Sequence, residues 1–177
     1  MKRRQKLTIA LGALHISVDQ ISLRRLANVQ MGTSDPNSGT TWKALADAGQ
    51  ASGIKVTGLY QGQGKVYRNW SIDDLKNELA QGHPVLLLVR YRNLPGNAQS
   101  PFRSGYYVVT SGFDQSGDLV YDDPAHYNGT GADRAISLDA LNRAWSNTSV
   151  GRTHRDGVVG IAMRDAGGGR APAHVVR

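Results

Sequence analysis

The sequence predicts a single α+β domain in which helices come first, an antiparallel sheet follows, and the helices pack on one side of that sheet. Three observations support this fold class. Helix-capping signals recur in the N-terminal half, residues 83–91 are a continuous apolar run of strand length, and residues 104–129 read as two strands around a tight turn. With 177 residues, the chain is long enough for one domain with a real core and too short for two of ordinary size.

The predicted helices begin where the sequence offers a capping residue. Ser71, with Asp74 three residues later, forms a capping box, and Gly82 closes the helix that it opens. Caps and apolar residues at helical spacing predict helices over residues 7–14, 18–28, 41–53 and 72–80, and a last one that begins near Ser137 and extends through Trp145.

The predicted strands lie mainly in the second half of the chain. The run HPVLLLVRY indicates a central strand that is buried on both faces, because it shows no alternation of apolar and polar residues. A turn at Gln115-Ser116-Gly117 joins the two strands that follow. The full set of predicted strands covers residues 54–60, 83–91, 105–112, 118–122 and 157–163.

The net charge of +7 comes from the two ends of the chain. Residues 1–25 carry six basic and one acidic side chain, residues 164–177 carry three and one, and residues 26–163 carry twelve of each. A nucleic-acid-binding protein is expected to place a basic stripe on its folded surface, where it can follow phosphates. The neutral body therefore argues against a nucleic-acid partner.

The two ends carry further signals. MKRRQKLTIALGALHISV has the basic start and apolar run of a short secretory signal, but its apolar residues also fall at helical spacing, so the localisation, cytoplasmic or secreted in a bacterium, stays open. No apolar run is long enough to span a membrane. We expect residues 1–164 to form the domain, with a truncated first helix whose apolar seam favours a homodimer, and residues 165–177 to form a disordered tail.

An ordered set of segments resembles a known family. These segments are SVDQISLRRL, GTTWKALADAGQASGIKVTGLY, LKNELAQGHPVLLLVRY, the strand opening GYYVV, and the YDDP that ends the next strand. Over roughly residues 7–163 their order and spacing resemble the papain-like cysteine peptidases of the bacteriocin-leader-processing kind, the family-39-like peptidase domains. The resemblance implies a papain-like fold.

The resemblance also implies a catalytic triad of cysteine, histidine and aspartate, of which this chain keeps one member. The family's aspartate falls on Asp123, but its histidine falls on Tyr106, and the nucleophile position near residues 2–5 holds Lys-Arg-Arg-Gln. The chain contains no cysteine. A tyrosine, with an ordinary pKa of about 10, cannot act as the general base near neutral pH.

Other residues are weaker candidates. His126 follows Asp123-Pro124 and could reach toward the vacant cleft, and Tyr107 is either a peptide-binding residue or a plain strand aromatic, with one of the two neighbouring tyrosines in the core and the other outside it. Alternation sends Asp122 and Asp123 to opposite faces, so that one of them is expected to orient loop amides. The five histidines show no metal-ligand spacing, so no metal and no cofactor are expected.

We therefore expect an inactive peptidase-like domain that binds a peptide or protein, or that serves as a structural module. The alternative is an active leader-processing peptidase whose nucleophile segment is missing from this chain.

Overall fold

The structure is a computed structural model that describes residue 32 and residues 40–64, 66–123, 131–146 and 158–165. Its elements lie at α3 (Trp42–Ala51), β1 (Ile54–Thr57), α4 (Ile72–Ala80), β2 (Val85–Arg90), the 3-10 helix η1 (Tyr91–Asn93), β3 (Gly105–Phe113), β4 (Leu119–Asp122), β5 (Arg134–Ile136), α5 (Leu138–Ser146) and β6 (Gly160–Asp165). Among the described residues, no helix is both long enough and apolar enough to cross a membrane.

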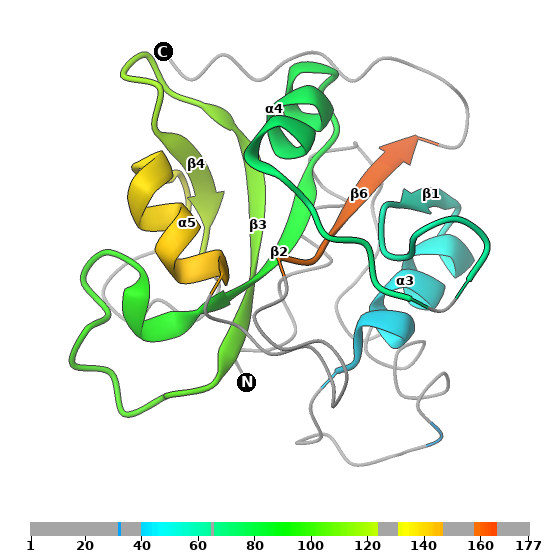
Figure 1. Cartoon of the computed structure of the whole chain (residues 1–177), viewed down its shortest axis with the longest axis horizontal. Coiled ribbons are helices and arrows are strands. Elements are labelled where there is room, and N and C mark those ends of the chain that lie inside the picture. The colour runs from blue at the N-terminus through cyan, green and yellow to red at the C-terminus, as the bar shows by residue number, and fades with distance from the viewer. Residues whose placement is uncertain (1–31, 33–39, 65, 124–130, 147–157, 166–177) are drawn as a thin grey trace.

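The strands form one antiparallel sheet of six, in the order β1-β6-β2-β3-β4-β5 (Figure 1). Strand β2 lies inside the sheet, where Leu87 faces Val108 of β3 on one side and Gly160 of β6 on the other. Five of its six residues are buried. The prediction of a central strand that is buried on both faces is confirmed.

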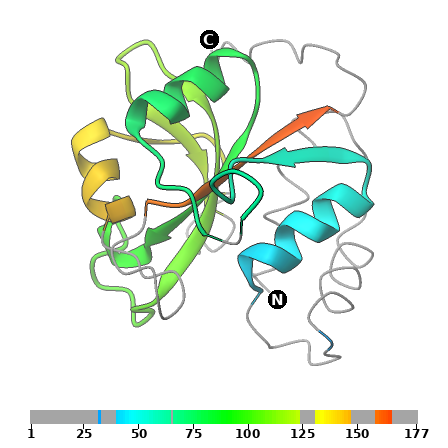
Figure 2. The same cartoon turned by 45° about the vertical axis from the view of Figure 1, so that its right-hand side comes forward.

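Helices cover both faces of the sheet. On one face α3 packs on Leu86 and Leu88 of β2, and on the other α4 and α5 pack on Leu87 and its neighbours (Figure 2). The expected placement of all helices on one side is therefore wrong for the described chain, although the α+β class is confirmed. The physical reason is that β2 is apolar on both sides and each side needs its own cover.

The local signals that predicted the helices act as expected. Thr41 accepts a hydrogen bond from the Ala44 N–H and caps α3. Ser71 and Asp74 form the reciprocal capping box of α4, and Gly82 follows that helix with a φ of 76°. The helix boundaries at these positions could therefore be predicted from the sequence.

Several predictions differ from the structure in extent or fall outside it. Strand β5 was not predicted, because three residues are too few to show an alternating pattern. Strand β6 extends through Asp165, the first residue of the predicted tail. The two earliest helices, residues 7–14 and 18–28, and the rest of the tail lie outside the described residues.

Candidate functional site

Tyr106 and Asp123 lie on the same face of the sheet, the face that α4 and α5 cover. Tyr106 packs in the core cluster of that face together with Tyr121 of β4. Asp123 comes two residues after Tyr121, directly beyond the end of β4, and alternation along the strand points it the same way. The structure therefore brings to one face of the sheet the two positions that the family resemblance singled out. We call this surface, with Asn97 and Phe102 of the preceding loop, the Tyr106 face.

The Tyr106 ring is enclosed by other aromatic rings. It is 5% exposed, its centroid lies 5.1 Å from that of Tyr91, and it meets Phe102 edge to face at 5.8 Å. Tyr91 and Phe102 also meet edge to face, at 5.8 Å. Such ring pairs add stability beyond the area that they bury. A large aromatic ring thus fills the position to which the family resemblance assigns a histidine.

Asp123 is fully buried and has a side-chain donor. The Asn97 Nδ2 donates to the Asp123 Oδ2 over 3.3 Å, and Asn97 is itself 2% exposed. The Asp123 N–H donates to the Gly131 carbonyl at 2.7 Å. Because the amide nitrogen must face the carboxylate, the Asn97 Oδ1 points elsewhere, and it has no hydrogen-bond partner among the described residues. A lone loop asparagine gives no signal in the sequence, and this residue was missed.

Three arginines hold the loop that carries Asn97 and Phe102. The Arg90 guanidinium donates to the Arg103 carbonyl at 2.9 Å, and the Arg92 Nε donates to the Ser100 carbonyl at 2.6 Å. Arg134 reaches across from β5, where its Nη2 donates to the Pro95 carbonyl at 2.7 Å. Backbone carbonyls in a loop otherwise rely on water, so these donors fix the loop against the sheet.

The phenol of Tyr121 belongs to the same environment. Burial raises the pKa of Tyr121, and the negative charge of Asp123 acts in the same direction, while a hydrogen bond from the Arg134 Nε at 3.3 Å and the charge of Arg134 oppose the rise. The raised pKa keeps this phenol protonated at neutral pH.

Tyr107 lies on the opposite face of the sheet. Its ring packs edge to face on Trp42 of α3, with 4.8 Å between centroids, and its hydroxyl donates to the Thr40 carbonyl at 3.2 Å. Burial raises its pKa. Tyr106 is a buried member of the core cluster on its face, whereas Tyr107 is half-buried and packs against the cluster on the other face. The sheet therefore separates Tyr107 from Tyr106 and Asp123.

The neighbouring carboxylate, Asp122, orients a loop as predicted. Its Oδ1 accepts the Asp133 N–H at 2.9 Å. Burial is the main cause of a raised pKa for Asp122; the hydrogen bond from Asp133 lowers that pKa and the charge of Asp133 raises it. Asp133 has a φ of 49°, so this contact stabilises a turn whose backbone is in the left-handed region.

His126 lies outside the described residues, so the structure does not show whether it reaches the Tyr106 face. Within the described ranges, no three His, Asp or Glu side chains lie close enough together to hold a metal ion.

Comparison with known proteins points to one family. Residues 7–151 match the model of the peptidase C39-like family. A crystal structure of a C39-like peptidase from Bacillus anthracis is similar to this chain, with a TM-score of 0.55 and 17% identity over 92% of this chain and 88% of the other. At that identity the likeness supports the fold alone. No curated protein matches the chain significantly.

Proposed function

Because the chain belongs to the peptidase C39-like family, we propose that these residues form a peptidase-like domain that binds a peptide or protein without cleaving it. The observation that carries the proposal is the burial of Tyr106, a phenol at the position to which the family resemblance assigns a histidine. Cysteine peptidases need an imidazole to take the thiol proton and a thiolate to attack. The chain supplies neither a cysteine nor, at this position, an imidazole.

The Tyr106 face retains features that suit binding. Phe102 is a partly buried aromatic ring at the edge of the cluster, and the loop that carries it is fixed by arginine donors. Rigid aromatic side chains are effective anchors for a partner because little conformational entropy is lost when they are covered. In this proposal the half-buried Phe102 is the apolar anchor for a bound chain, the buried Tyr106 supports the Phe102 ring from below, and Asp123 with Asn97 holds the loop and strand end in place.

Two measurements test the two parts of the proposal. Purified protein incubated with a quenched-fluorescent peptide library is expected to show no turnover, whereas turnover that Asp123→Ala abolishes would contradict the loss of catalysis. Fluorescence anisotropy with a labelled decapeptide library is expected to detect binding that Phe102→Ala weakens. Val66→Ala is the matched control, because Val66 is the exposed large hydrophobic residue of the described chain, at 65% exposure, and the adjacent Tyr67 packs against the core cluster of the opposite face. Equal losses from both variants would count against binding there.

One observation favours a second candidate, an active cysteine peptidase whose nucleophile lies in residues outside this sequence. Asp123, to which the family resemblance assigns the role of the triad's aspartate, is buried and accepts a hydrogen bond from Asn97. The product of the complete reading frame distinguishes the two candidates. Because these 177 residues contain no cysteine, peptide turnover that iodoacetamide abolishes would place a thiol nucleophile outside them and favour the enzyme.

A further inference from the structure

A second candidate site lies at the far end of β3 from Tyr106. A cavity of about 550 Å³ opens between α4, the β3–β4 hairpin and the start of α5. It is lined by Lys76, Leu79, Ala80, Ser111, Gly112, Phe113, Gly117 and Leu138. Phe113 is seven residues beyond Tyr106, which is about 23 Å along a strand. This site is therefore independent of the proposed function of the Tyr106 face.

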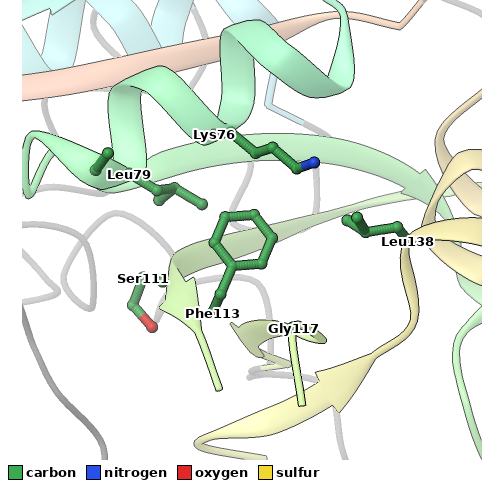
Figure 3. Close-up of a pocket in the computed structure, with 8 residues that line it drawn as sticks. Lys76, Leu79, Ser111, Phe113, Gly117 and Leu138 are labelled. Atoms are coloured by element: carbon green, nitrogen blue, oxygen red, sulfur yellow. The ribbon is translucent and has the colours of Figure 1, made fainter. Parts of the chain in front are cut away.

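The cavity has an apolar floor and a single cation. Figure 3 shows the Phe113 ring between Leu79 of α4 and Leu138 of α5, with the Lys76 side chain reaching over it. No carboxylate of another described residue forms an ion pair with the Lys76 ammonium. An apolar pocket with a few polar groups at its edge is the usual form of a ligand site, and a volume of several hundred Å³ is typical of such sites.

A β-bulge shapes this end of the hairpin. Thr110 pairs with Tyr121 and Gly112 pairs with Val120, so Ser111 is an extra residue on β3 with no partner on β4. Bulges bend a strand and redirect its side chains, and they are frequent beside functional sites. Here the bulge brings Ser111 and Phe113 into the lining of one cavity.

The openness of the cavity indicates what kind of molecule fits. Lys76, Ala80 and Gly117 are exposed, so an occupant can leave the cavity through a wide mouth. A free fatty acid needs its whole hydrocarbon chain to be covered, because methylene groups that stay in water contribute no binding free energy. A polypeptide end needs cover for only one side chain, and its carboxylate can meet an ammonium at the rim.

We propose that this cavity binds the C-terminal residue of a peptide or protein partner, with an apolar side chain against Phe113 and the terminal carboxylate at Lys76. The apolar contact provides the binding energy, and the charge selects a free carboxylate over an amide. Because the Lys76 ammonium is exposed, its contribution is modest and decreases as salt is added.

The test compares the tetrapeptide Gly-Ser-Gly-Leu with its C-terminal amide by titration into ¹⁵N-labelled protein. We expect the free acid to shift the amide signals of Ser111, Phe113 and Gly117, and to bind about 2- to 5-fold more tightly than the amide at low salt. Lys76→Gln is expected to remove that difference. Lys55→Gln, which changes an exposed lysine on edge strand β1, is expected to leave it unchanged.

Three results would overturn the proposal. The first is equal affinity of the acid and the amide for the unchanged protein. The second is an equal loss from Lys55→Gln and Lys76→Gln. The third is binding of octanoate, seen as shifts of the same amide signals, without binding of the peptide, which would assign the cavity to a free acid.

Ala80→Glu provides a second variant on an exposed position, where the new carboxylate is expected to repel the peptide acid more than its amide.

Discussion

The Asn97 Nδ2 donates to the Asp123 Oδ2 over 3.3 Å, and neither side chain is more than 2% exposed. The two residues are 26 positions apart, so this contact joins the loop after η1 to the end of β4. A buried carboxylate that loses one of its hydrogen-bond donors is less well compensated for the cost of desolvation. The pair therefore contributes to stability whether or not Asp123 has any role in chemistry.

Asn97→Ala is expected to lower the free energy of unfolding by about 1–3 kcal/mol, because the Asp123 carboxylate loses its amide donor. Urea denaturation followed by circular dichroism measures the change. Asn77→Ala is the control, since Asn77 is exposed on α4 and is expected to change stability by less than about 0.5 kcal/mol. A neutral result for Asn97→Ala would show that water replaces the amide.

Gly58→Ala is expected to be strongly destabilising, by about 3 kcal/mol or more. Gly58 has a φ of 87°, and a Cβ there would lie 2.3 Å from the Trp70 Cζ2, so strain and steric overlap add together. Gly62→Ala carries only the cost of backbone strain, about 1 kcal/mol, because its φ is 62° but nothing lies within 4 Å of the added Cβ. Equal melting temperatures for the two variants would mean that Trp70 moves aside without cost.

Asp74→Ala is expected to destabilise the protein at neutral pH and to lose its effect in acid. Burial raises the pKa of Asp74, but hydrogen bonds from Ser71 and the charge and hydrogen bond of Arg68 outweigh burial and lower the pKa overall. A lowered pKa stabilises the folded state at pH values above the pKa of the unfolded chain, about 3.9. This stabilisation is lost as the pH falls through the pKa of the folded state.

The comparison with Asp73→Ala isolates the capping box in that experiment. Asp73 lies in the same first turn of α4 and shares its favourable interaction with the helix dipole, but Asp74 alone completes the reciprocal cap with Ser71. Thermal melts of both variants between pH 2 and pH 7 are expected to converge only at the acid end. Parallel curves for the two variants would contradict this account.

Asp122→Asn is expected to stabilise the protein at neutral pH. Burial raises the pKa of Asp122, so the folded state holds this proton more tightly than the unfolded chain does. Stability therefore falls as the pH rises from the pKa of the unfolded chain, about 3.9, through the higher pKa of the folded state. An asparagine oxygen can still accept from the Asp133 N–H without carrying the charge.

The difference in melting temperature between Asp122→Asn and the unchanged protein is therefore expected to be positive at pH 7 and to vanish near pH 3. Asp118→Asn, a nearby substitution on the hairpin, is the control. A loss of stability at pH 7 would show that the charged hydrogen bond to Asp133 is worth more than the cost of burying the charge.

Much of the fold could be predicted because the sequence signals for its helices and strands are local. The capping box of α4 joins residues three apart, and the apolar run of β2 is a property of five consecutive positions. The candidate site could be predicted from the sequence only in part. Tyr106 and Asp123 were found through resemblance to a family, and the structure places them on one face, but Asn97 was not found, because its partner is 26 positions away.

The sequence by itself determined that this is an α+β chain without a cysteine, with a phenol at position 106 and a strand apolar on both sides. Only the tertiary structure decided that α3 covers one face and α4 and α5 the other, that Tyr107 is separated from Tyr106 by the sheet, and that a bulge at Ser111 borders a cavity with Lys76 at its rim. The reason is the separation along the chain over which each kind of signal acts. Caps and periodicity act within a few residues, whereas the identity of the group packed across a sheet depends on how distant segments meet.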